Sequence, residues 1–238
     1  MTARADLIHV GADRFRVLPW QGDRGVALVS PIPGDRPPAP DAIRRCIDLL
    51  AGRGVREVVT GALASPEMSG FLGAGFEVRE QLHLLAHDLR VLPDAPASLR
   101  LRRARPADRP AVLAVDAAAF DRFWQLDAAG LADALDATTT SRFRVTSGDP
   151  LVGYLITGRA GVRGYLQRLA VAPDRQRRGI GAGLVVDGLR WLRRHRVQQA
   201  VVNTQVTNLA ALAMYERLGF LRQAEGLSVL TRATGLDG

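Results

Sequence analysis

A strand, a turn rich in arginine and glycine, and an amphipathic helix follow one another between residues 164 and 195. The strand is expected at 164–172 and the helix at 180–195. Apolar residues recur in the helix at a spacing of three or four, which places them on one stripe. They are Ile180, Leu184, Val185, Leu189 and Leu192. A buried strand is expected next, at 200–204. This succession predicts a fold of the α/β class with a mixed sheet.

The remainder of the C-terminal half continues the alternation of strands and helices. Asp108 and Asp127 stand where they can cap two helices, and Gly219 stands where a third can end. Helices are expected at 108–120, 127–135 and 209–218. Strands are expected at 99–102, 143–146, 151–158, 220–221 and 227–231. The predicted order of elements is β-α-α-β-β-β-α-β-α-β-β.

A connector between two lobes is expected at residues 91–98, where two prolines forbid regular structure. The predicted domains are therefore residues 1–95 and 96–238. Within the first lobe, five prolines fall between residues 31 and 40, which predicts a loop between strands and a helix.

The two lobes share a pattern of apolar residues. Residues 47–59 resemble 189–201, the Gly-Phe ending of 71–76 resembles that of 214–220, and 82–85 resemble 227–230. We interpret the first lobe as a shortened copy of the second that lacks its initial strand and first two helices. Chance recurrence of a common α/β pattern is the alternative.

The formal net charge of +8 is confined to the second lobe. The first lobe holds 11 Arg and 12 acidic residues, and the second holds 21 Arg and 12 acidic residues; the chain has no Lys. Much of the excess flanks the helix at 180–195, a pattern that suits one anionic ligand at least as well as a polyanion. Nucleic-acid binding therefore ranks last among the functions considered.

Other classes of protein are excluded by length and composition. No apolar run approaches 18 residues and no signal-like stretch follows Met1, so we expect a cytoplasmic protein that does not contact a membrane. Cys46 has no partner for an intrachain disulfide, and the four histidines show no metal-ligand spacing, so no metal site is expected. The oligomeric state is left open.

The turn between strand and helix has the properties of an anion site. Free N–H groups at the start of a helix, the helix dipole and three arginines all favour negative charge. Two nucleotide-binding motifs do not fit. The dinucleotide fingerprint requires glycine where Leu184 stands, and a Walker loop requires a lysine.

Residues 176–181, Gln-Arg-Arg-Gly-Ile-Gly, resemble the [QR]-x-x-G-x-[GA] signature of the GNAT superfamily of acetyl-CoA-dependent N-acetyltransferases. The strand end at 169–171, followed by Pro173, resembles the central strand of that family. Residues 208–220 resemble its N-x-x-A-x-x-L-Y-x-x-x-G-F segment. The resemblance covers about residues 98–232, and the first lobe is similar to the later part of the same fold. Tandem acetyltransferases with one degenerate half are the nearest architectural parallel.

The resemblance implies a role for each matching residue. Arg177, Arg178, Gly179, Gly181 and Ala182, with Gln176 of the same signature, would cradle the pyrophosphate of acetyl-CoA as cosubstrate. Leu169, Ala170 and Val171 would lie along the pantetheine arm, Leu169 and Val171 bonding its amides, and Asn208 would touch the same arm. Tyr215 would lie beside the sulfur as the general acid that protonates the leaving thiolate, and the N–H of Val171 would stabilise the oxyanion.

A general base is missing from the strands on which several members of the family carry a glutamate. Gln167, Asn203 and Gln205 stand there instead, and they could hold a water that relays the proton. The other candidates are acids of the helix pair, namely Asp116, Asp121 and Asp127.

The predicted activity is transfer of an acetyl group from acetyl-CoA to a primary amine, either a peptide α-amine or a small-molecule amine. The alternative is a non-catalytic acyl-CoA-binding regulatory module, because the expected carboxylate is absent. The resemblance of residues 208–220 to ribosomal-protein N-terminal acetyltransferases is compatible with a peptide acceptor. Antibiotics, polyamines and small metabolites are acetylated on the same scaffold, however, so fold alone does not decide the substrate.

Overall fold

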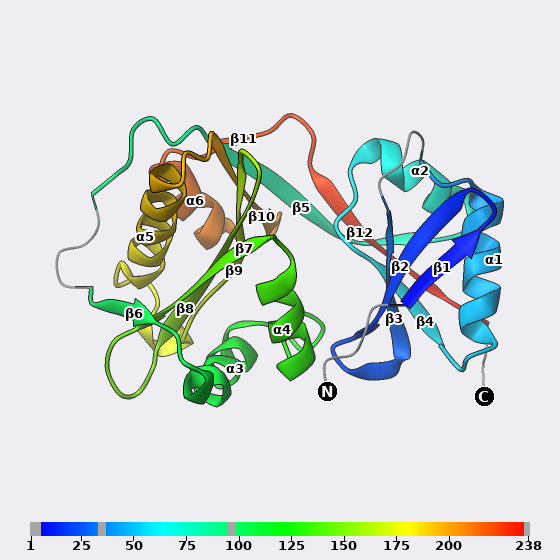
Figure 1. The fold of residues 1–238 in the computed structure, drawn as a ribbon, viewed down its shortest axis with the longest axis horizontal. Helices are drawn as coiled ribbons and strands as arrows, with labels where there is room; N and C mark the ends of the chain where they lie inside the picture. Colours follow the sequence, from blue (N-terminus) through cyan, green and yellow to red (C-terminus); the bar gives the residue numbers. More distant parts are fainter. Residues whose placement is uncertain (1–5, 33–36, 95–98, 236–238) are drawn as a thin grey trace. The chain divides into compact units, whose positions relative to one another are not determined.

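The computed structural model describes residues 6–32, 37–94 and 99–235, drawn as a coloured ribbon in Figure 1. The chain forms two compact units. Unit 1 contains Met1–His83, Gln205–Thr207 and Ala224–Gly238, and unit 2 contains Leu84–Thr204 and Asn208–Gln223. These units differ from the successive segments 1–95 and 96–238, because the last strand of the chain belongs to unit 1 and the end of β5 belongs to unit 2.

Unit 1 consists of six strands and two helices in its described part. They are β1 (Asp6–Val10), β2 (Asp13–Trp20), β3 (Asp23–Pro31), α1 (Pro40–Ala51), β4 (Glu57–Thr60), α2 (Ser65–Gly73), most of β5 (Glu77–His87) and β12 (Leu227–Ala233). β1, β2 and β3 pair antiparallel, and β3 pairs parallel with β4. β12 lies between β4 and β5 and pairs antiparallel with both.

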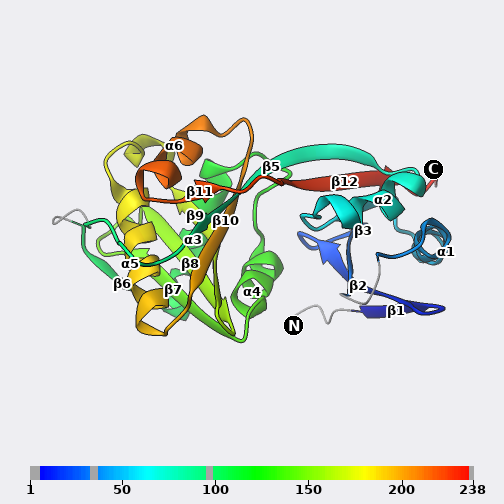
Figure 2. The same ribbon diagram turned by 90° about the horizontal axis from the view of Figure 1, so that it is seen from above.

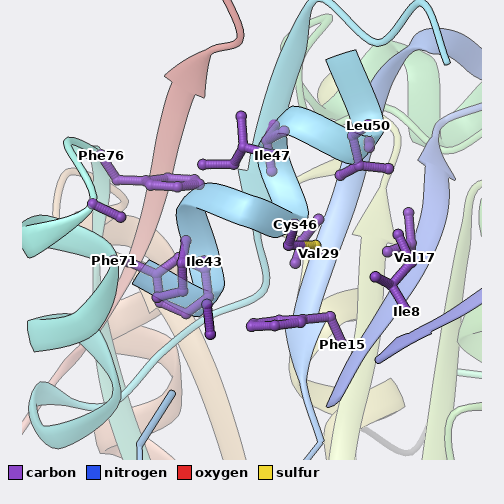
Figure 3. Close-up of a cluster of buried hydrophobic side chains, with 14 of the residues drawn as sticks. Ile8, Phe15, Val17, Val29, Ile43, Cys46, Ile47, Leu50, Phe71 and Phe76 are labelled. Carbon is purple, nitrogen blue, oxygen red and sulfur yellow. The ribbon is translucent and has the colours of Figure 1, made fainter. Parts of the chain in front are cut away.

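The core of unit 1 lies between its strands and helix α1. Buried α1 residues recur at a spacing of three or four, so one face of the helix is apolar. In Figure 3 the side chains of Ile43, Cys46 and Leu50 point toward the strands. Burial raises the pKa of the Cys46 thiol to about 11. Cys46 is therefore an inert core residue.

Unit 2 contains all of the predicted elements except the last strand, β12, in its described part. They are β6 (Leu101–Arg103), the short 3-10 helix η1 (Pro106–Asp108), α3 (Arg109–Ala119), α4 (Ala128–Asp136), β7 (Thr140–Thr146), β8 (Gly153–Ala160), β9 (Arg163–Val171), the short 3-10 helix η2 (Pro173–Arg175), α5 (Ile180–Arg194), β10 (Gln199–Gln205), α6 (Leu209–Arg217) and β11 (Leu221–Arg222). The predicted α/β class with a mixed sheet is confirmed, since β7, β8 and β9 are antiparallel whereas β9 and β10 are parallel.

Helices cover both faces of the sheet in unit 2, as Figure 2 shows. Side chains alternate between faces along a strand. Accordingly Leu155 of β8 packs in a cluster with α5 and α6, whereas its neighbours Tyr154 and Ile156 pack with α3 and α4. Residues 172–179 join β9 to α5, so the N-terminus of α5 follows the end of β9 in the chain.

The two units repeat the same pairings. β1, β2, β3 and β4 of unit 1 pair in the order and directions of β7, β8, β9 and β10 of unit 2. Helices α1 and α2 follow the third and fourth strands, as α5 and α6 do. This arrangement agrees with the interpretation of the first lobe as a shortened copy. Within the described residues, no helix is long and apolar enough to cross a membrane.

Candidate functional site

The parallel strands β9 and β10 are paired along only part of their length. Their register holds three residue pairs, from Gln199 with Arg163 to Val201 with Tyr165. Beyond Tyr165, β9 continues to Val171 and β10 continues to Gln205. The described residues of β10 therefore leave the last six residues of β9 without a strand partner on that side.

The backbone groups of Leu169 and Val171 face this unpaired side. The N–H of Ala172 donates to the carbonyl oxygen of Val152 at 2.9 Å. In an antiparallel pair, successive residues point alternately toward and away from the partner strand. Ala170, opposite Tyr154, is therefore bonded to β8, whereas Leu169 and Val171 present their N–H groups away from it. Two of the three predicted strand residues thus offer free backbone donors, and Ala170 does not.

The turn that follows β9 places a row of N–H groups at the start of α5. Arg177 has φ of 58° and Gly179, the N-cap residue, has φ of 80°, a left-handed conformation that favours glycine. The first α-helical bond runs from the N–H of Gly183 to the carbonyl oxygen of Gly179 at 2.9 Å. The N–H groups of residues 180–182 precede it and have no helical acceptor.

Side chains of the turn hold its shape. The amide of Gln176 donates to the carbonyl oxygen of Val171 at 3.1 Å, and Arg178 donates to the carbonyl oxygen of Asp174 at 3.3 Å. Arg177 is exposed, and within the described ranges no acceptor lies within hydrogen-bond distance of its guanidinium. A guanidinium at this position adds positive charge to the row of N–H groups.

Gly181 lies where β9, α5 and α6 meet. A Cβ atom at this position would be 3.2 Å from Sδ of Met214 and 3.7 Å from Cγ2 of Val171. The predicted phosphate-binding turn, the free end of β9 and helix α6 are therefore brought together in unit 2. Ala182, the next residue of α5, is half-buried and packs against the apolar cluster that contains Leu155 of β8.

Two predicted residues come from α6. The side-chain oxygen of Asn208 accepts from the N–H of Ala211 at 3.1 Å, so Asn208 is the N-cap of the helix. Tyr215 is 4% exposed, and its ring lies 5.4 Å from that of Phe220 in an edge-to-face contact. Burial raises the pKa of the Tyr215 phenol. The hydroxyl therefore stays protonated at neutral pH, as a general acid requires.

The three acids of the helix pair are all engaged in structural contacts. Asp116 is fully buried, and both its oxygens accept from Arg168 at 2.8 Å. It also accepts from the hydroxyl of Tyr154. Asp121 caps a turn by accepting from the N–H of Phe123 at 3.0 Å, and Asp127 caps α4 by accepting from the N–H of Gly130 at 2.7 Å. These contacts occupy both oxygens of Asp116, but only Oδ1 of Asp121 and of Asp127, which act as caps.

The polar residues of the two splayed strands differ in their surroundings. Gln167 is the extra residue of a bulge in β9, and Asn203 is exposed. In unit 1, the side-chain amide of Gln205 donates to the carboxylate of Glu80 at 2.9 Å. Sequence reasoning overlooked Glu80, because a partner of Gln205 on β5 follows only from the pairing of distant strands.

In unit 1 the region that corresponds to the end of β9 and the start of α5 has neither separated strands nor an open helix start. All four residues of β4 pair with β3, so these strands do not separate. Helix α1 begins with Pro40, which has no N–H. Helix α2 lies against that end, since a Cβ on Gly70 would clash with the carbonyl oxygen of Pro38 and one on Gly73 would be 3.0 Å from Pro40. Part of the predicted proline-rich loop, residues 33–36, lies outside the described residues.

Comparison with known proteins finds a similarity to one family over part of the chain. The acetyltransferase (GNAT) family matches residues 112–220. Over 148 residues the chain is 34% identical to a mycothiol acetyltransferase of Saccharomonospora viridis, which covers 54% of this chain and 47% of that protein. A segment of 60 residues is 40% identical to N-alpha-acetyltransferase 30 of Xenopus laevis, covering 25% of this chain and 22% of that protein. The chain thus spans less than half the length of these curated relatives.

A solved structure shares the fold of this chain over the whole length of this chain. A tandem GNAT protein from the clavulanic acid biosynthesis pathway has a TM-score of 0.68 and 16% identity, covering 100% of this chain and 85% of that one. The predicted fold class is confirmed by this similarity.

Proposed function

We propose that this chain, whose residues 112–220 belong to the acetyltransferase (GNAT) family, transfers an acetyl group from acetyl-CoA to a primary amine. The observation that carries the proposal is the splayed edge of β9 directly before a row of free N–H groups at α5. A thioester with a pyrophosphate and two amides matches such a row of donors.

Most of these residues would bind acetyl-CoA and would not take part in the chemical step. The N–H groups of 180–182 and the Arg177 guanidinium would hold the pyrophosphate. The free N–H groups of Leu169 and Val171 would face the pantetheine arm and the acetyl carbonyl, respectively. Arg178 and Gln176 would keep the turn in shape. The small size of Gly181 would let the start of α5 lie close to Met214 of α6 and Val171 of β9.

The chemical step would form a C–N bond to the acetyl carbon and break its C–S bond. The departing thiolate would take a proton from the Tyr215 hydroxyl, while the N–H of Val171 would stabilise the oxyanion. The amine acceptor would then lose its own proton to solvent or to an ordered water, because Asp116, Asp121 and Asp127 are engaged in structural contacts. We favour acceptors with a large unprotonated fraction for this reason.

A second candidate function is binding of acyl-CoA without turnover. The structural engagement of all three candidate acids favours it. A screen distinguishes the two: thiol release from acetyl-CoA is measured with peptides, aminoglycosides, polyamines and amino acids as acceptors. Amine-dependent release supports transfer, whereas calorimetric binding of acetyl-CoA without release supports the binding module.

A further inference from the structure

A cavity of about 530 Å³ lies in unit 2 beside the edge strands β6 and β7 and the C-terminal end of α5. Its lining is rich in arginine and contains no acidic residue. The lining residues are Arg103, Ala104, Arg105, Pro106, Arg109, Leu135, Thr140, Ser141, Arg142, Phe143, Arg144, Trp191 and His195. The acetyl-transfer chemistry proposed above uses none of them.

Two of the arginines share one carboxylate. Asp187 lies 3.0 Å from Nη2 of Arg142 and 3.2 Å from Nε of Arg144. The two guanidinium side chains are only 19% and 18% exposed. Burial, together with the repulsion of Arg144 and Arg194, lowers the pKa of Arg142 although Asp187 acts to raise it. Arg142 and Arg144 together therefore carry one positive charge more than Asp187 neutralises. Their guanidinium groups are partly removed from water, where binding of an anion would be strongly favoured.

The other three arginines enlarge this excess. Arg103, Arg105 and Arg109 are exposed, and within the described residues no carboxylate lies within ion-pair distance of them. The acid nearest in sequence, Asp108, is bonded through both oxygens to Arg102 at 2.7 Å. The lining therefore has five arginines, of which Arg142 and Arg144 share Asp187, and the carboxylate of Asp108 also accepts from the backbone N–H of Arg105 at 2.6 Å.

The geometry points to a small molecule with two or more adjacent phosphate groups as the ligand of this cavity. A planar guanidinium matches the oxygens of a phosphate in a two-point contact, and the hydroxyls of Thr140 and Ser141 add further donors. The site is a concave pocket on one edge of the sheet and not a stripe of charge, so it fits a compact polyphosphate better than a nucleic-acid strand.

This polyphosphate site is separate from the turn between β9 and α5, where acetyl-CoA is proposed to bind. Helix α5 carries the turn at its N-terminus and Trp191 near its C-terminus, and its 15 residues span about 20 Å at 1.5 Å per residue. A ligand in the cavity and acetyl-CoA at the turn can therefore bind the same chain at once, whether or not acetyl transfer occurs.

Calorimetric titration of the full chain with inorganic tripolyphosphate and with ATP tests the inference. We expect one site per chain for each probe, unchanged by saturating acetyl-CoA. Tighter binding of ATP than of tripolyphosphate identifies a nucleotide as the source, and equal binding identifies the phosphates alone. The double variant Arg103→Gln/Arg109→Gln is expected to weaken both by about tenfold or more, because two charge-assisted contacts are lost.

The charge-matched control is Arg193→Gln/Arg217→Gln, which removes two exposed arginines that do not line the cavity. It is expected to change the affinity by about twofold or less, since exposed charges are screened by salt. Four results would overturn the inference: no binding, equal weakening in both double variants, displacement of the probes by acetyl-CoA, or their displacement by single-stranded RNA with a steep salt dependence. Acetyl-CoA binding, measured in parallel, reports separately on the proposed function.

Discussion

The side-chain amide of Gln176 donates to the carbonyl oxygen of Val171 at 3.1 Å and so ties the arginine turn to the last residue of β9. Gln176 itself is exposed. The contact joins the two sets of N–H donors assigned to acetyl-CoA, those of β9 and those of α5.

The variant Gln176→Leu is expected to weaken acetyl-CoA binding by about 3–10-fold, because loss of one hydrogen bond of about 1 kcal/mol frees the turn. Calorimetry measures the affinity. Gln198→Leu, at another exposed glutamine of unit 2, serves as control and should bind as the wild type does. Equal affinity in all three proteins would show that the contact does not order the turn.

Unit 1 should bind no coenzyme, so one acetyl-CoA per chain is expected at saturation. Its strands β3 and β4 remain paired, and Pro40 opens α1 without an N–H. The number of sites from titration under tight-binding conditions checks this. Two sites per chain would contradict the assignment.

Asp116 is expected to act in stability and not in proton transfer. Asp116→Asn should lower the free energy of unfolding by about 3–5 kcal/mol, because Arg168 loses its partner in a buried position. The control Glu216→Gln breaks a surface pair whose side chains are 41% and 49% exposed, for which a loss of about 0–1 kcal/mol is expected. Denaturant unfolding measures both. A stable Asp116→Asn protein without activity would restore Asp116 as a candidate base.

Tyr215→Phe should lower turnover by about 10²–10⁴-fold and change acetyl-CoA affinity little, because the hydroxyl is needed only as the thiolate develops. Burial raises the pKa of this phenol, so the acid form persists above its ordinary titration range. Turnover of the wild type should therefore show no loss from tyrosine ionisation up to about pH 10. Equal turnover in the two proteins would make Tyr215 a packing residue.

Local patterns in the sequence were sufficient to predict the elements of unit 2. The apolar stripe of α5, the cap Asp127 and the helix end at Gly219 are short-range signals, and the structure shows each of them. Asp108 was also predicted to cap a helix, but its carboxylate bonds to Arg102 and makes no side-chain capping bond to α3. The arginine turn is likewise continuous in the chain, so its free N–H groups could be predicted from residues 176–182 alone.

Relationships between distant strands could not be predicted in this way. The position of β12 between β4 and β5, and the assignment of the end of β5 to unit 2, arise from pairing that no local pattern encodes. For the same reason Asp116 resembled a free acid in the sequence, since its partner Arg168 lies 52 residues further along the chain. The early end of the pairing between β9 and β10 is likewise encoded by no local pattern.

Mass spectrometry of the amine products tests the central claim most directly. Wild-type protein is incubated with acetyl-CoA and the acceptor found by the screen, beside Gly181→Asp and Gly181→Ala. The account predicts an amine that gains one acetyl group with equimolar release of CoA, retained in Gly181→Ala and lost in Gly181→Asp, whose carboxylate repels the pyrophosphate. Release of CoA without any acetylated amine, or full activity in Gly181→Asp, would contradict it.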